Sequence, residues 1–238
     1  MKTIEVLYPE LGHLYGDYYN AAYLSASMGE AQVIQTSEWA APAFTQGNVD
    51  VIYIGAMSEQ NQEFALQRLL PHREAMRAAV EGGTVVLATG NALELFGSFI
   101  QDGERELPCL EILDFHAVRD MDGRKNCLFL GEFAGEKIVG HKGQASFGYG
   151  LEKYPFIQVQ GGFGSDATGK NEGVHYKNFF GTYLMGPFLL LNPYFVKHIL
   201  KILELDTTLA YEKEILEAYR FRLEELTRPD RSFALGSE

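Results

Sequence analysis

The stretch TVVLATGNALELFG, Thr84–Gly97, decides the fold. It begins with an apolar segment, Thr84–Ala88, which is typical of a strand that is buried on both faces of a sheet. The chain then turns through Thr89-Gly90-Asn91 and enters a short helix, predicted over Ala92–Phe96. In an open α/β sheet, the turn after such a strand is where ligands and nucleophiles lie. This turn contains neither cysteine nor serine, so its position and its chemistry point in different directions.

Strand and helix patterns alternate on the N-terminal side of this stretch. Strands are predicted at Ile4–Tyr8, Ala31–Thr36 and Val49–Ile54. Helices are predicted from Asp17, as N-cap, to Met28, from Asn61 to Leu70, and from Pro71 to Val80. This alternation predicts one α/β domain, a mixed, mainly parallel twisted sheet with helices on both faces.

The second half of the chain has a different pattern. Short strands are predicted at Leu113–Arg119, Asn126–Gly131 and Lys137–Gly140, and the turn signals between them indicate antiparallel hairpins. Glycine-rich loops are predicted at 147–150 and 161–173, a strand at Asn178–Leu184, and helices at Pro193–Leu203 and Thr208–Leu226. We expect the domain to span residues 1–227 and a frayed, flexible tail to span residues 228–238.

The composition excludes several functional classes. Hydrophobic residues make up 46% and charged residues 22% of the 238 residues, which is enough for a well-filled core. The net charge of −12 disfavours nucleic acid and anionic membranes as partners. No apolar run reaches the roughly 20 residues that a membrane span needs, and the N-terminus does not resemble a signal peptide. We therefore expect a cytoplasmic protein with two reduced thiols, Cys109 and Cys127.

Three turns, at Tyr15–Tyr18, Gly55–Glu59 and Thr89–Ala92, are predicted to line one pocket at the carboxyl edge of the sheet. Ordinary tight βα turns explain the same pattern. None of the turns matches a phosphate loop or a dinucleotide fingerprint. The six histidines lack the helical spacing of a metal site, and the two cysteines lack metal-ligand spacing. We therefore expect neither a metal nor a cofactor.

Several motifs resemble the class I glutamine amidotransferase-like family of the cobyric acid synthase type. They are LYPELGHLYGDYYN at Leu7–Asn20, YIGAMSEQNQ at Tyr53–Gln62, LEILDF at Leu110–Phe115, SFGYG at Ser146–Gly150 and EGVHYKNFFGTYLMGPFLLLNP at Glu172–Pro193. Within the family, the amidotransferase subunits of lipid II isoglutaminyl synthases carry similar motifs. The resemblance covers roughly residues 4–205, in matching order and spacing. It implies a class I glutamine amidotransferase fold.

The resemblance also implies a mechanism. In the family, a cysteine thiolate at the strand-to-helix turn attacks the glutamine amide, and a histidine held by an acid passes the proton to the leaving ammonia. Backbone N–H groups of a glycine-rich loop stabilise the oxyanion. Ammonia then passes to a partner that activates an acceptor carboxylate with ATP.

Transferred to this sequence, the mechanism lacks its reacting groups. The nucleophile position falls on Gly90 and the histidine position on Met185, whereas the acid is retained as Asp17. Two glycines of the oxyanion loop fall on Ala56 and Met57. The acid of a further family motif falls on Lys142. Losing either member of a nucleophile–base pair removes nearly all of the pair's effect.

The sequence therefore predicts a catalytically degenerate member, without glutaminase activity, that binds a small amide or amino-acid ligand or a partner. The expected partner is a Mur-ligase-like or other ATP-dependent amidation subunit, in cell-wall or cobalamin biosynthesis. The expected ligand pocket consists of Gly55, Ala56, Met57, Thr89, Gly90, Asn91, Glu94, Lys142 and Met185.

Two alternatives remain open at this point. One is an enzyme of changed chemistry that acts on another amide or amino acid in the same pocket. The other is an active amidotransferase whose cysteine was removed by mutation, which the second change at Met185 disfavours.

Overall fold

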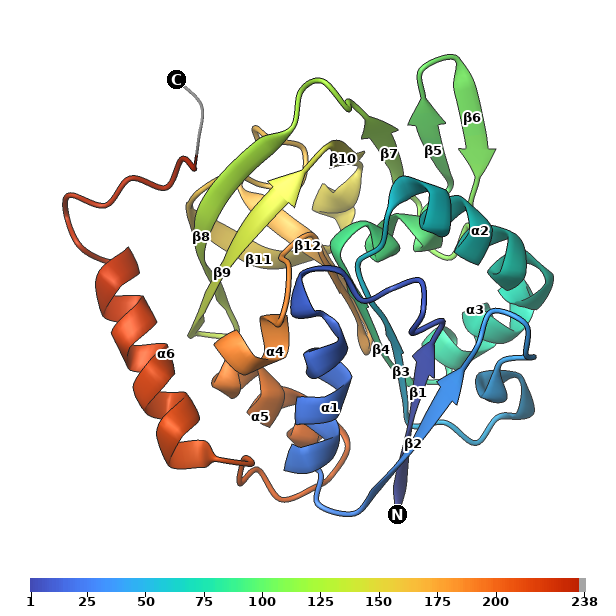
Figure 1. Ribbon diagram of the computed structural model, residues 1–238, viewed down its shortest axis with the longest axis horizontal. Helices are drawn as coiled ribbons and strands as arrows, with labels where there is room; N and C mark the ends of the chain where they lie inside the picture. The colour runs from blue at the N-terminus through green and yellow to red at the C-terminus, as the bar shows by residue number, and fades with distance from the viewer. Residues whose placement is uncertain (236–238) are drawn as a thin grey trace.

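A nine-stranded mixed sheet runs through the computed structural model, which describes residues 1–235 (Figure 1). Its strand order is β2-β1-β3-β4-β13-β12-β11-β8-β9. The first five strands in that order are parallel: β2 (Ala31–Thr36), β1 (Lys2–Leu7), β3 (Val51–Ile54), β4 (Val85–Thr89) and β13 (Phe179–Thr182). The other four continue the sheet with antiparallel pairing: β12 (Asn171–Tyr176), β11 (Pro155–Gly161), β8 (Lys125–Phe133) and β9 (Glu136–Gln144).

The parallel half is buried on both faces because its strands carry apolar side chains at every position. Along β3, Ile52 and Ile54 join one apolar cluster, whereas Val51 and Tyr53 join the cluster on the opposite face. Successive side chains of a strand point to opposite faces, so a continuous apolar run feeds two cores.

Helices cover both faces of this sheet (Figure 1). Side chains of α2 (Glu59–Leu69) and α3 (Arg73–Glu81) belong to one of the two clusters. Those of α1 (Tyr18–Ser27), α4 (Phe188–Leu191) and α5 (Pro193–Ile202) belong to the other, and α6 (Glu212–Leu226) packs beside them against β8 and β9. The predicted single α/β domain with helices on both faces is confirmed.

A second sheet of four strands has the order β10-β7-β5-β6. It consists of β10 (Ser146–Tyr149), β7 (His116–Arg119), β5 (Phe99–Asp102) and β6 (Arg105–Pro108). The sequence analysis assigned residues 147–150 to a loop and did not predict the β5–β6 hairpin. Both sequences are glycine-rich or polar, and their strand pairing comes from neighbours that are distant in the chain.

The predicted elements of the first half agree with the structure to within a few residues, and the second half contains more strand than expected. Residues 161–173, predicted as loop, include the end of β11 and the start of β12. Antiparallel pairs are as numerous as parallel pairs in the large sheet, four of each among the described residues.

After α6, the segment predicted as a tail returns to the large sheet. Leu128 donates a backbone hydrogen bond to Phe233 (2.8 Å), and Leu235 donates one to Asn126 (3.1 Å). The end of the predicted tail, residues 236–238, lies outside the described residues. Over residues 1–235, every helix is too short or too polar to span a bilayer.

Candidate functional site

The turn after β4 has the backbone of a nucleophile elbow. Thr89 is extended, and Gly90 has φ +59°, in the left-handed region that favours glycine. Residues Gly90–Phe96 then form a short 3₁₀ helix instead of the α-helix that commonly follows such a turn. Position 90 therefore lies at the sharpest point of the turn, at the carboxyl edge of the parallel strands.

Ala56, in the turn after β3, fills the space beside Gly90. A Cβ atom built on Gly90 would lie 2.5 Å from the Cβ of Ala56 and 3.1 Å from its Cα. Carbon atoms that are not bonded to each other do not approach so closely. The site therefore has no room for a side chain at position 90 while Ala56 keeps its present position.

The two backbone N–H groups of the β3 turn already have hydrogen-bond partners. Ala56 N donates to Asp17 Oδ2 (2.7 Å), and Met57 N donates to Asn91 Oδ1 (3.1 Å). Asn91 Nδ2 in turn donates to Met57 O (2.9 Å). An oxyanion hole requires free donors aimed at the developing charge. Here the corresponding donors hold the two turns together.

Asp17 serves as a clamp between three turns. Besides Ala56 N, it accepts hydrogen bonds from Thr89 Oγ1 (2.5 Å) and Asn20 Nδ2 (3.1 Å). The Tyr53 hydroxyl adds a contact to Thr89 Oγ1 (3.0 Å). Burial raises the pKa of Asp17 from 3.8 to about 6, although the hydrogen bonds from Thr89 and its other neighbours oppose the rise. The carboxyl group is thus engaged in packing the loops rather than facing a cavity.

Met185 follows β13 and lies at the position that the resemblance assigns to the histidine. Its backbone N–H donates to His141 O (3.1 Å), and its side chain is 7% exposed. A Cβ added at Gly143 would lie 2.8 Å from Met185 Cε. A thioether can neither accept a proton from a nucleophile nor donate one to ammonia.

Lys142 lies in a buried polar cluster apart from the cavity described below. Its ammonium is 2.5 Å from Glu172 Oε2 and also donates to the carbonyls of Phe163 and Gly164 (both 3.2 Å). Glu172 also accepts hydrogen bonds from Ser165, Thr182 and the Tyr183 backbone. This complete set of partners makes the ion pair a support for the segment after β13.

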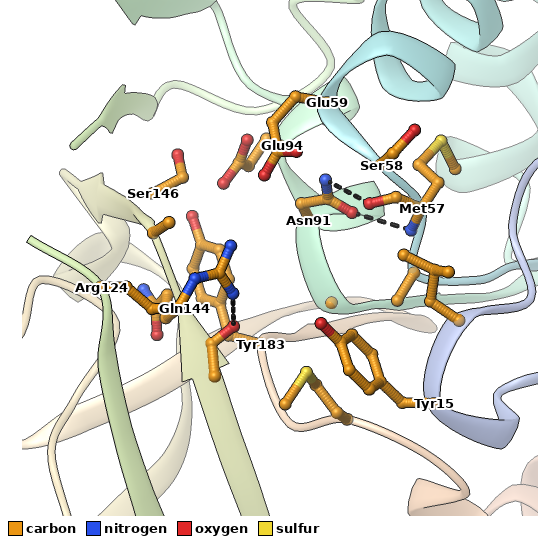
Figure 2. Close-up of a pocket in the computed structure, with 16 residues that line it drawn as sticks. Tyr15, Met57, Ser58, Glu59, Asn91, Glu94, Arg124, Gln144, Ser146 and Tyr183 are labelled. Carbon is orange, nitrogen blue, oxygen red and sulfur yellow. Dashed lines mark hydrogen bonds between the residues drawn. The ribbon is translucent and has the colours of Figure 1, made fainter. Parts of the chain in front are cut away.

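A cavity of about 150 Å³ lies beside the β4 turn (Figure 2). Six of the nine residues predicted for the ligand pocket line it: Ala56, Met57, Gly90, Asn91, Glu94 and Met185. Gly55, Thr89 and Lys142 do not. The Thr89 hydroxyl is directed to Asp17 and Tyr53, and Lys142 points to Glu172, on the other side of the strand ends.

The sequence analysis missed other polar side chains that line the cavity. They are Tyr15, Glu59, Arg124, Gln144, Ser146 and Tyr183. Gln144 is two residues after Lys142 on β9, and strand periodicity places the two on one face. Tyr183 is two residues before Met185, and Ser146 begins the SFGYG motif. Their convergence depends on the contact between the two sheets, which sequence spacing does not encode.

Glu94 is the most deeply buried acid of the cavity lining, with 1% exposure. Its Oε2 accepts a hydrogen bond from Gln62 Nε2 (2.8 Å). Burial raises the pKa of the Glu94 carboxyl, and the hydrogen bond from Gln62 opposes the rise. Burial and the nearby charge of Glu94 hold the pKa of the Tyr183 hydroxyl well above its usual value.

Neither cysteine can replace the missing nucleophile. Both Cys109 and Cys127 are buried, neither lines the cavity, and burial raises the pKa of the Cys109 thiol to about 12. His175, in β12, contacts Lys177 O through Nε2 (2.8 Å) and stacks on Phe180. Within residues 1–235, no group of three His, Cys, Asp or Glu side chains is arranged to hold a metal ion.

The elbow geometry and the surrounding motifs agree with a match over most of the chain. The profile of the CobB/CobQ-like glutamine amidotransferase domain matches residues 3–192. The chain belongs to this family. Its fold agrees with that assignment: a crystal structure of a glutamine amidotransferase superposes with a TM-score of 0.58, at 14% identity, covering 84% of this chain and 99% of the other.

Two relatives of this CobB/CobQ-like chain are lipid II isoglutaminyl synthase (glutamine-hydrolyzing) subunits GatD. The one from Staphylococcus aureus is 26% identical over 190 residues, covering 78% of this chain and 74% of the relative. The one from Streptococcus pneumoniae is 25% identical over 205 residues, covering 80% and 75%. Both names describe a subunit of a larger synthase.

Proposed function

We propose that this chain is a non-hydrolysing member of the CobB/CobQ-like amidotransferase family that binds a small ligand in the cavity beside the β4 turn. The observation that carries the proposal is the contact between positions 90 and 56. Gly90 offers no nucleophile, and Ala56 fills the space that a side chain at position 90 would need. Both loop N–H groups that could stabilise an oxyanion are already bonded.

The cavity supports ligand binding more than changed chemistry. Ser146 is the one lining serine whose hydroxyl has no hydrogen-bond partner among the described residues, and so no base activates it. The Ser58 hydroxyl accepts the Asn61 N–H as helix cap (3.2 Å). The Thr89 hydroxyl donates to Asp17 and does not reach the cavity. Met57 and Met185 narrow the space without closing it.

We further propose that the chain works as a subunit beside a Mur-ligase-like, ATP-dependent enzyme. The printed names of the two relatives, each a subunit of a lipid II isoglutaminyl synthase, support this assignment. Copurification with a Mur-ligase-like protein of the same organism is the expected result. Failure to associate at micromolar concentrations would contradict the proposed partner without affecting the proposal for the cavity.

A glutaminase assay tests the loss of hydrolysis. We expect the purified chain, alone and with its ligase partner, to release ammonia from glutamine no faster than buffer does. A hydrolysing GatD serves as positive control. A chain with Cys109→Ser and Cys127→Ser, assayed in parallel, separates thiol chemistry from other routes. Ammonia release well above buffer, unchanged in that variant, would show that another group in the chain hydrolyses glutamine and would refute the proposal.

A further inference from the structure

Four buried oxygen atoms around the cavity have no hydrogen-bond partner among the described residues. They are Glu94 Oε1, Gln144 Oε1, Ser146 Oγ and Tyr183 OH. Their residues are only 1%, 4%, 9% and 3% exposed, respectively. Leaving a buried polar atom unpaired is costly. Four such atoms at one cavity indicate that something absent from the chain itself completes them.

These atoms face the same space. Figure 2 shows Glu94, Ser146 and Tyr183 on one side of the cavity, with Asn91 and Met57 on the other. The Asn91 side chain is already bonded to Met57, so the unsatisfied groups are concentrated around Glu94. The geometry therefore forms a polar end and a less polar end.

The free oxygen of Glu94 is fixed by a chain of hydrogen bonds behind it. Arg119 donates to Gln62 Oε1 (2.8 Å), so the Gln62 amide nitrogen must face the other way. That nitrogen donates to Glu94 Oε2 (2.8 Å) and to Asn91 O (2.6 Å), which uses both of its protons. Glu94 Oε1 is thus the oxygen left to accept from a ligand.

The polar end is built to accept protons from a cation. A carboxylate oxygen and an amide oxygen can only accept hydrogen bonds, because Glu94 is a carboxylate when ionised and the Gln144 amide nitrogen donates to Ser165 O (2.7 Å). Ser146 and Tyr183 have hydroxyls that can accept as well. Glu59 adds a second acid to the lining, and Arg124, its one lysine or arginine, is exposed.

We propose that this cavity binds the primary ammonium group of a small amino compound, held by Glu94 Oε1 and the three oxygens near it. The inference rests on the proposed function, since it takes the cavity to be a ligand site. An ammonium group supplies three donors and the charge that the buried carboxylate lacks. Water can fill such a space but brings no opposite charge. A neutral carboxamide supplies donors but also brings a carbonyl oxygen toward the acceptors.

The test compares two probes of similar size on the full chain: propylammonium chloride and propanamide. Binding is followed by the shifts of backbone amide signals in NMR. We expect saturable shifts with propylammonium at residues of the cavity, and about ten-fold weaker binding of propanamide. Equal or tighter binding of propanamide would overturn the proposal, as would the absence of saturable propylammonium binding.

Three variants locate the contact. Glu94→Gln keeps the shape but presents an amide, so propylammonium should bind at least about ten-fold more weakly. Ser146→Ala, which removes one hydroxyl that has no partner to lose, should also weaken binding, and covers the case in which Glu94→Gln does not fold. Glu104→Gln removes an exposed acid at the β5–β6 turn and should leave affinity unchanged. Unchanged affinity in both cavity variants would refute the assignment.

The result is separable from the glutaminase assay because neither probe is glutamine. A chain that hydrolyses glutamine and also binds propylammonium through Glu94 would refute the proposed loss of hydrolysis and leave the ammonium site standing. A chain that releases no ammonia and prefers propanamide would do the reverse.

Discussion

At the scale of single residues, positions 90 and 56 must be considered together. Gly90 alone would read as a missing nucleophile, which a cysteine could restore. The 2.5 Å approach between a Cβ at position 90 and Ala56 Cβ shows that the opposite turn has also changed the space available. A thiol at position 90 would need a smaller residue at position 56.

The pair makes a quantitative prediction for stability. Gly90→Ala should lower the free energy of unfolding by about 3 kcal/mol, because it combines a left-handed backbone with overpacking against Ala56. Adding Ala56→Gly should recover the overpacking part, so the double variant should be less destabilised than the sum of the single changes. Urea unfolding of the four proteins measures this coupling. Strict additivity would show that the two positions do not compete for space.

At the scale of elements, β9 is an edge strand whose outer side is capped by side chains. Asn192 Oδ1 accepts from Val139 N (2.8 Å), and its Nδ2 donates to Val139 O (2.9 Å) and Phe188 O (2.8 Å). Tyr219 OH donates to Lys137 O (2.8 Å). These contacts satisfy an edge that would otherwise pair with another chain. They also anchor α4 and α6 to the sheet.

The Asn192 cap should be important for stability. Asn192→Ala removes three buried hydrogen bonds and leaves the Val139 backbone unpaired, so it should cost about 3 kcal/mol. Asn178→Ala is the matched control, because its amide makes one hydrogen bond, to Gly83 O (2.7 Å), and should cost about 1 kcal/mol. Denaturant unfolding compares the two. Similar losses would mean that solvent or neighbouring groups replace the Asn192 contacts.

At the scale of the whole molecule, the ends of β1, β3 and β4 are tied together by one buried acid. Asp17 accepts hydrogen bonds from the turns after β3 and β4, while it lies in the turn after β1. The second sheet closes the other side of the cavity and is linked to it through Arg119, Gln62 and Glu94. The site therefore exists only when both sheets are assembled.

Asp17 should make stability depend on pH. Its pKa rises from 3.8 to about 6 on folding, so the native state holds this proton more tightly and stability falls as pH rises through that window. From about pH 7 to about pH 5, the wild-type chain should gain about 1 kcal/mol from this group. Asp17→Asn should lose that gain, whatever its absolute stability.

Glu63→Gln is the control, because the Arg119 hydrogen bond holds the Glu63 pKa below 4.5. Its contribution is lost only at lower pH, so this variant should keep the wild-type slope between about pH 5 and about pH 7. Thermal unfolding across the range measures the slopes. An unchanged slope in Asp17→Asn would show that Asp17 ionises at its ordinary pKa in the folded chain.

The sequence by itself determined the α/β architecture, the parallel strands and the position of the elbow, because apolar runs and helix signals are local patterns. The motifs determined the family and the two substituted positions, Gly90 and Met185. Six of the nine residues predicted for the pocket reached the cavity because they follow the carboxyl ends of neighbouring strands. Lys142 did not, since its charge found a buried partner in Glu172, which lies 30 residues away.

Only the tertiary structure decided whether the elbow is open, what fills it and which polar atoms face the cavity. The contact of Ala56 with Gly90 joins two turns, and the unpaired oxygens of Glu94, Gln144, Ser146 and Tyr183 come from separate segments. Such convergence depends on how the two sheets pack. Strand periodicity fixes the face on which a side chain lies, but packing between distant strands fixes what it meets there.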